Sequence, residues 1–285
     1  MRFDFTKMQS LGNDFVVLDG VSQELIVSPE VARKLADRHF GVGCDQILLA
    51  EPDETADFRF RIFNQDGSEV EQCGNGARCM AWFLRQKGLS DKAEISVQTL
   101  NSQMLLRIRE DGDVTVEMGV PEFEPSQIPF DAAERAKRYG LTLNRHTVDI
   151  AAVAIGNPHA VIEVENVDTA EVATLGPEVE NHQRFPARVN AGFMQVMSPR
   201  HIRLRVHERG VGETLGCGSG ACAAVVIGIE SGKLEHIVKV TLPGGDAMVE
   251  WAGPGRPVYL SGPAQTVFSG QISLYNGEHH SFPDN

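Results

Sequence analysis

No two cysteines of the chain are separated by exactly two residues, and the five cysteines are an odd number. Both facts argue against a disulfide framework and against a structural zinc site. No apolar run approaches the ~20 residues of a membrane-spanning helix. Residues 1–9 carry Asp4 and lack the apolar core of a signal peptide. We therefore expect a cytoplasmic protein that does not bind a membrane.

The chain also has fewer basic than acidic residues. The chain has 26 Lys and Arg against 39 Asp and Glu, which gives a net charge of −13. Nucleic acids and anionic membranes are bound by clustered basic residues, so neither is expected as a partner. A small anionic substrate stays compatible with this charge, because a few well-placed cations can override the total. The 285 residues, 42% of them hydrophobic and 23% charged, are enough for two ordinary folded domains.

Four separated segments recur at a constant spacing of 144 positions. A single register over so long a span indicates a duplicated domain, with about 119 residues in each copy. The matching segments are 11–13 with 155–157, 58–61 with 202–205, 73–77 with 217–221, and 114–116 with 258–260.

The joint between the copies is marked by Pro121, Pro125 and Pro129, which predict a linker near 120–130. A short helix is expected to follow over about 131–139. The tail is expected to add strands to the first copy and to be disordered from Asn276 onward. The predicted first half is therefore 1–119 plus 263–285, and the second half is 120–262.

Alternating apolar residues and β-branched residues predict short strands in both copies. Equivalent helices are expected to begin near Asn75 and Ser219 and to end at Gly88 and Gly232, and a third should begin at Ser28-Pro29. The helix from Ser219 is apolar almost all round, so it should lie buried inside its sheet. The pattern predicts an α+β fold of two pseudo-symmetric halves, each a mixed sheet curled around a central helix. The expected strands are 15–18, 95–100, 104–108 and 114–118, then 148–155, 161–164, 237–242 and 258–260.

Cys73 and Cys217 each stand just before a predicted helix, inside a Cys-Gly-x-Gly-Ala turn. Glycines let the backbone approach a ligand, and the unpaired N–H groups of the first helical turn attract an anion. The same helix end is expected to lower the pKa of a neighbouring thiol. For Cys44, Cys79 and Cys222 we expect only buried thiols.

Two such turns related by a duplication would face one cleft between the halves. A substrate carboxylate could lie between the two helix ends, with one sulfur on each side of its α-carbon. One thiolate would then remove the α-proton and the opposite thiol would return a proton to the other face. This chemistry inverts a stereocentre and needs no cofactor, neither metal nor pyridoxal phosphate.

Two other readings of the glycine-rich turns are weaker. The segment 214–220 resembles the first motif of S-adenosylmethionine methyltransferases, but the residues before it indicate a loop instead of a buried strand. The turn at 73–76 is not followed by the Gly-Lys-Ser/Thr of a P-loop.

Seven motifs together resemble those of the diaminopimelate epimerases, and they span nearly the whole chain. Within them Cys44-Asp45-Gln46 and Glu208-Arg209-Gly210 distinguish this family from the related proline racemases. The resemblance implies an enzyme that interconverts LL- and meso-2,6-diaminoheptanedioate, with two α/β halves around one cleft. The motifs are Lys7–Phe15, Gly41–Gln46, Phe63–Gly67, Cys73–Cys79, Gly156–His159, Val206–Gly210 and Gly216–Cys222.

The resemblance also implies roles for single residues. Cys73 and Cys217 would be the acid/base thiols, and His159 and Glu208 would tune their pKa values. Gly74, Asn75, Gly218 and Ser219 would form the carboxylate cradle at the reacting carbon. The remaining substrate contacts would be Asn13, Gln46, Asn64, Asn157, Asn190, Glu208 and Arg209.

The repeat places several of these residues at equivalent positions, since Asn13 pairs with Asn157, Gln46 with Asn190 and Asn64 with Glu208. An asparagine after glycine is usually a turn residue, and for Asn13 or Asn157 taken alone that interpretation stays open. Arg209 can hold a carboxylate and Glu208 an ammonium, which suits a substrate with two amino-acid ends. The alternatives are a racemase of proline or hydroxyproline and a non-enzymatic thiol redox sensor or binding protein. A small-molecule substrate and a homodimer are the expected partners.

Overall fold

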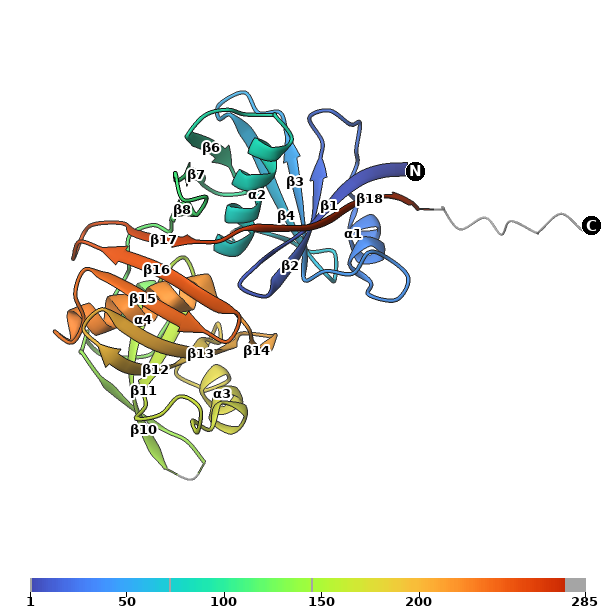
Figure 1. Cartoon of the computed structure of the whole chain (residues 1–285). Helices are drawn as coiled ribbons and strands as arrows, with labels where there is room; N and C mark the ends of the chain where they lie inside the picture. Colours follow the sequence, from blue (N-terminus) through green and yellow to red (C-terminus); the bar gives the residue numbers. More distant parts are fainter. Residues whose placement is uncertain (1, 72, 145, 275–285) are drawn as a thin grey trace, which may run out of the picture.

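The computed structural model describes residues 2–71, 73–144 and 146–274. The chain forms two halves, each a curved sheet around one long helix (Figure 1). The first half contains β1 (Arg2–Ser10), β2 (Asn13–Asp19), α1 (Pro29–Ala36), β3 (Gln46–Glu51), β4 (Phe58–Asn64), β5 (Glu69–Val70), α2 (Gly74–Gln86), β6 (Glu94–Gln98), β7 (Gln103–Ile108) and β8 (Val114–Glu117).

The second half repeats this order of elements after one additional strand at its start. It contains β9 (Tyr139–Thr142), β10 (Thr147–Ala154), β11 (Pro158–Glu163), α3 (Val172–Glu180), β12 (Asn190–Ser198), β13 (His201–Glu208), β14 (Gly212–Thr214), α4 (Gly218–Glu230), β15 (Ile237–Leu242), β16 (Gly245–Trp251) and β17 (Val258–Gly262). A short 3-10 helix, η1 (Pro125–Gln127), lies between the halves in sequence, and β18 (Gln265–Ser273) follows β17.

The pairing of the strands confirms the duplication. In the first half β2 is parallel to β3 and β4 is parallel to β6, and all other neighbours are antiparallel. In the second half β11 is parallel to β12 and β13 is parallel to β15, in the same places of the repeat. The central helices α2 and α4 each contain 13 residues and begin 144 positions apart.

Each central helix is enclosed by its own sheet. The helix α2 contacts strands β1, β2, β3, β7 and β8, and α4 contacts β10 to β13 and β15 to β17. Ten residues of α4 are buried, among them the run from Gly220 to Gly228, as its apolar sequence predicts. One hydrophobic cluster includes side chains of both helices and both sheets. The α+β fold predicted from the sequence is therefore present.

Two strand pairings join the halves. The last strand of the first half, β8, is antiparallel to β17 of the second. The chain then returns through Pro263 to β18, which is antiparallel to β1 (Figure 1). The strands expected in the tail therefore extend the first sheet, and the residues from 275 onward lie outside the described part.

The helix expected over 131–139 is wrong. Residues 131–138 are irregular, and Tyr139 begins strand β9, which pairs with β10. Contacts from elsewhere in the chain fix this segment: the Arg184 guanidinium donates to the carbonyls of Asp131 and Gly140 and lies over the Phe130 ring. Helix α3, on the other hand, was not expected, because Gly176 and Pro177 lie inside it.

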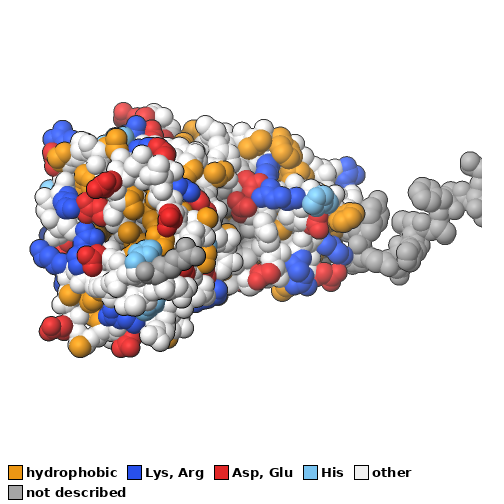
Figure 2. Space-filling model, turned by 90° about the horizontal axis from the view of Figure 1, so that it is seen from below, with side chains coloured by type: hydrophobic (Ala, Val, Ile, Leu, Met, Phe, Trp, Pro, Cys, Tyr) orange, Lys and Arg blue, Asp and Glu red, His pale blue; other side chains and the backbone are white. Residues whose placement is uncertain are grey.

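The surface carries both signs of charge. Figure 2 shows acidic and basic side chains interspersed over the visible face of both halves. Many of them form ion pairs, such as Arg203 with Asp168 and Arg205 with Glu213. Within the described ranges, no helix has the length and apolar character needed to cross a membrane.

Candidate active site

The two repeated cysteines occupy equivalent places at the ends of the central helices. Cys73 is the N-cap of α2, where its sulfur accepts a hydrogen bond from the Gly76 amide at 3.3 Å. Cys217 is the N-cap of α4, and its sulfur lies 3.7 Å from the Ser219 hydroxyl. Extended backbone at both cysteines lets each helix begin at the following glycine.

The first turns of α2 and α4 touch each other. The Asn75 side-chain amide donates to the Gly216 carbonyl of the second half at 2.9 Å. A Cβ added to Gly218 would stand 3.4 Å from the Asn75 Oδ1 atom and 4.0 Å from the Gly74 Cα atom. These are ordinary contact distances, so the two turns pack directly against each other, and the tightest neighbour of the added Cβ would be the Leu260 side chain at 2.9 Å. The expectation that both glycine-rich turns meet at one place is thus confirmed by the packing.

Burial makes both thiols weak acids here. The enclosed surroundings raise the pKa of Cys73 to about 11 and the pKa of Cys217 well above its usual value. The expectation that the helix ends lower these pKa values is therefore wrong for the substrate-free protein, because loss of hydration outweighs the hydrogen bonds that the sulfurs receive. Both groups are thiols at neutral pH in this state.

Glu208 lies close to both sulfurs. It ends β13, its carboxylate accepts a hydrogen bond from the Thr214 hydroxyl, and burial raises its pKa. Besides burial, its negative charge raises the pKa of both Cys217 and Cys73. A carboxylate whose pKa is raised is a stronger base than an ordinary carboxylate and can accept a proton from a neighbouring group.

Asn13 connects the Cys73 thiol to the first sheet. Its amide nitrogen donates to the Asp45 carboxylate at 2.8 Å, so the amide oxygen points the other way. That oxygen accepts from the Cys73 thiol at 3.9 Å and from the Asn75 amide at 3.4 Å. Asp45 therefore orients Asn13, and Asn13 contacts two residues at the end of α2.

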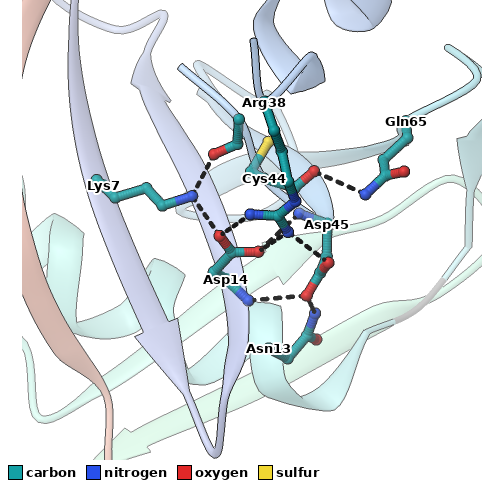
Figure 3. Close-up of polar contacts among 8 residues, drawn as sticks. Lys7, Asn13, Asp14, Arg38, Cys44, Asp45 and Gln65 are labelled. Carbon is teal, nitrogen blue, oxygen red and sulfur yellow. Dashed lines mark hydrogen bonds and ion pairs between the residues drawn. The ribbon is translucent and has the colours of Figure 1, made fainter. Parts of the chain in front are cut away.

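Asn13 is connected through Asp45 to a network of charged side chains (Figure 3). The Arg38 guanidinium donates to both oxygens of Asp14, at 3.0 and 2.8 Å, and to Asp45 at 2.9 Å. Lys7 donates to Asp14 and to the Gly43 carbonyl. These cations hold the pKa of Asp14 far below its usual value, although burial opposes them. The local sequence does not reveal this network, because its members come from separate segments.

Gln46 and Asn64 lie side by side where β3 begins and β4 ends. The Gln46 amide nitrogen donates to the Asn64 side-chain oxygen at 2.9 Å, and Asn64 donates to the Ser68 hydroxyl at 3.1 Å. The side-chain oxygen of Gln46 is buried and finds no partner within the described ranges. A buried acceptor left open in this way is suited to a donor brought by a ligand.

The equivalent residues of the second half form a second polar group. The Asn190 amide donates to the Pro158 carbonyl at 3.0 Å and accepts from the Arg209 backbone at 2.9 Å. The His159 ring lies 2.8 Å from the Asn157 side chain, and burial lowers the pKa of His159 to about 3. The ring is therefore neutral, and within residues 2–71, 73–144 and 146–274 neither it nor Asn157 hydrogen-bonds a cysteine.

A buried contact between Glu180 and His207 holds the turn that carries Glu208 and Arg209. Glu180 of α3 lies 2.9 Å from the His207 ring and accepts from the Gly210 amide at 2.8 Å. The motif at 206–210 contains His207, but the sequence does not identify Glu180 as its partner, because Glu180 lies on helix α3, which was not predicted. The other cysteines are as expected: Cys44, Cys79 and Cys222 are buried free thiols.

Comparisons with known proteins show which family the chain resembles. A family model described as diaminopimelate epimerase matches residues 5–124 and 151–267. A protein of Nitrosospira multiformis named diaminopimelate epimerase is 55% identical over 275 residues, which are 96% of this chain and 99% of that one.

Solved structures share the fold at lower identity. A PhzF family phenazine biosynthesis protein of Bacillus anthracis has a TM-score of 0.70 and 16% identity, covering 96% of this chain and 100% of that one. A hydroxyproline epimerase of Agrobacterium vitis, with trans-4-hydroxy-L-proline bound, has a TM-score of 0.68 and 16% identity, covering 97% and 94%. At these identities the likeness concerns the fold alone.

Proposed function

The chain belongs to the diaminopimelate epimerase family, and we propose that Cys73 and Cys217 exchange the α-proton of its substrate. It is an epimerase, and the reaction interconverts LL- and meso-2,6-diaminoheptanedioate. One observation carries the assignment of the thiols. Each cysteine caps a central helix at the same position of the repeat, and the first turns of these helices touch.

The first turns of α2 and α4 supply the cradle for the substrate carboxylate at the reacting carbon. Backbone N–H groups at Gly74, Asn75, Gly218 and Ser219 stand at helix N-termini, where unpaired donors and the helix dipole favour negative charge. Removing the α-proton builds charge on the carboxylate oxygens. Donors that already point at those oxygens stabilise that charge without reorganisation.

The proton moves in two balanced steps. The thiolate of one cysteine takes the α-proton and becomes a thiol, while the thiol of the other gives its proton to the opposite face and becomes a thiolate. Because burial raises both thiol pKa values, forming the first thiolate needs a proton acceptor. Glu208, whose charge acts on Cys217, serves as that acceptor, and the neutral His159 keeps Asn157 in place.

The far end of the substrate is held by the amides and the guanidinium around the cysteines. The residues that we assign to these substrate contacts are Asn13, Gln46, Asn64, Asn157, Asn190, Glu208 and Arg209. The open acceptor at Gln46 suits an ammonium group, and Arg209 suits a carboxylate. A substrate with a second amino-acid end uses both, whereas proline would leave them unpaired, which favours diaminoheptanedioate over proline.

Solvent-deuterium incorporation at Cα tests this function. The purified protein should place deuterium at Cα of 2,6-diaminoheptanedioate in heavy water and should leave proline and hydroxyproline unlabelled. Labelling of proline or hydroxyproline alone would favour the racemase instead. If no amino acid is labelled, the chain is a thiol sensor or a binding protein.

The remaining assignments are also proposals. We assign 1–119 and 263–285 to one half and 120–262 to the other, which the pairing of β18 with β1 supports. Five free thiols suit the reducing cytoplasm. We propose a homodimer as well, and light scattering of the purified protein tests its mass.

A further inference from the structure

A wholly buried arginine lies on α2 one turn after Cys73. Arg78 has 0% of its surface exposed. Its guanidinium donates to the Ser10 hydroxyl through Nε at 3.1 Å and Nη2 at 2.8 Å, and to the Asn75 side-chain oxygen through Nη2 at 2.6 Å. Its third nitrogen, Nη1, is buried and has no hydrogen-bond partner in the described part of the chain.

The charge of Arg78 is not compensated by a carboxylate. No ion pair within 4.0 Å involves Arg78 among the residues that the structure describes, although most arginines of the chain have one. Burial lowers the pKa of the guanidinium, but arginine remains protonated. A buried cation with neutral partners and one open donor destabilises the folded chain. Its presence beside the site therefore suggests that an anion is formed or bound there.

The hydrogen bonds of Arg78 also fix the Asn75 amide. The Ser10 hydroxyl gives its own proton to the Pro263 carbonyl at 2.8 Å, so its oxygen can only accept from the guanidinium. Because the guanidinium occupies the Asn75 oxygen, the Asn75 nitrogen must face the other way. That nitrogen points to Asn13 and to the Gly216 carbonyl, which is the place where the two helix ends meet.

We propose that Arg78 is a positioning residue that orients the Asn75 amide and supplies the positive charge that stabilises the Cys73 thiolate and the carboxylate between α2 and α4. The identity of the carboxylate rests on the proposed function, whereas the effect on Cys73 does not need a substrate. The electrostatics agree, since the charge of Arg78 lowers the pKa of Cys73 against the effect of burial.

Other ionisable groups near these two residues must be considered in a titration. Around Arg78 they are Cys73 and Cys79 on its own helix, Cys222 on α4 and Asp113 before β8. Glu208 faces Cys73 from β13 and opposes the formation of a thiolate. The other four cysteines, Cys44, Cys79, Cys217 and Cys222, are buried, whereas Cys73 is only partly buried, so alkylation of the folded protein followed by peptide mapping can be assigned to Cys73.

Two substitutions separate charge from hydrogen bonding. Arg78→Gln keeps a donor for Asn75 and removes the charge, while Arg78→Lys keeps the charge. Arg85→Gln, on the same helix, is the matched control, because its guanidinium donates to the Lys92 carbonyl and has no part in the site. The full-length, substrate-free protein is alkylated with iodoacetamide over a range of pH, and kcat and KM are measured separately.

In Arg78→Gln the midpoint of Cys73 alkylation should move up by about one pH unit or more, and kcat should fall about tenfold or more. Arg78→Lys and Arg85→Gln should keep the midpoint of the wild type. An unchanged midpoint in a folded Arg78→Gln protein would overturn the proposal. If that variant does not fold, Arg78→Lys decides: a folded lysine variant with a raised midpoint would overturn the proposal equally.

The proposed function can fail separately. Absence of deuterium exchange in the wild type would refute the epimerase assignment and leave the alkylation result intact. A wild-type epimerase with an unshifted Arg78→Gln midpoint would refute the inference alone.

Discussion

Replacing Asp45 by asparagine tests how the site holds Asn13. The Asp45 carboxylate accepts the Asn13 amide at 2.8 Å and is the group that turns the Asn13 oxygen towards Cys73 and Asn75. A hydrogen bond to a charged acceptor contributes about 1.5–3 kcal/mol. If the whole of it is lost in the transition state, the rate falls roughly 10- to 150-fold.

The assay is a double-mutant cycle on kcat/KM with Asp45→Asn, Asn13→Ala and the two together. Because Asp45 acts through Asn13, the double variant should be no slower than Asn13→Ala alone. Asp111→Asn is the control, since the Asp111 carboxylate accepts from the Asp113 amide in an exposed turn. Additive losses in the cycle would refute the reasoning, because Asp45 would then act on something other than Asn13.

Four further predictions follow from the same contacts. Cys73→Ala and Cys217→Ala should each abolish epimerisation, whereas Cys79→Ala and Cys222→Ala should keep measurable activity; assays of the folded variants check this. Gly218→Ala should slow the reaction strongly, because the new Cβ lies 2.9 Å from Leu260 and 3.4 Å from Asn75, while Gly192→Ala, whose nearest contact is 3.6 Å, should not. The pKa of His159 is lowered to about 3 in the folded state, so the unfolded chain binds more protons below pH 6.5. Urea unfolding should therefore show the free energy of unfolding decreasing by about 1.4 kcal/mol for each unit that the pH falls from 6.5 to 4. In His159→Asn this decrease should be smaller. Mild oxidation of the empty enzyme should link Cys73 to Cys217 reversibly, with substrate protecting, and peptide maps that show only Cys73–Cys79 or Cys217–Cys222 pairs would contradict a shared site.

Much of the fold could be predicted because the chain is a duplication. The spacing of 144 positions gave the same order of strands and helices twice, and α2 and α4 begin where the paired turns placed them. The repeat also indicated Cys73 and Cys217 as candidates, since it brings both helix ends together, whereas the roles proposed for Asn13 and Asn75 came from the resemblance to the family.

The features that were missed depend on contacts between distant segments. The stretch 131–139 has a helical composition, but Arg184 fixes it in another conformation. The thiol pKa values were expected to be low from the helix ends alone, and only the folded structure shows that burial around the sulfurs outweighs this effect. Asp45 and Arg78 stood inside recognisable motifs, yet their partners Arg38 and Ser10 cannot be read from the local sequence.

The central claim is that two different groups, Cys73 and Cys217, act on opposite faces of one carbon. The most direct measurement follows the α-hydrogen during the first turnovers of one stereoisomer in heavy water. The account predicts that the inverted product carries solvent deuterium while the recovered substrate does not, because the hydrogen removed by one thiol is not the one returned by the other. Product that keeps the original hydrogen would show that a single group both removes and returns it, and would contradict the two-cysteine mechanism.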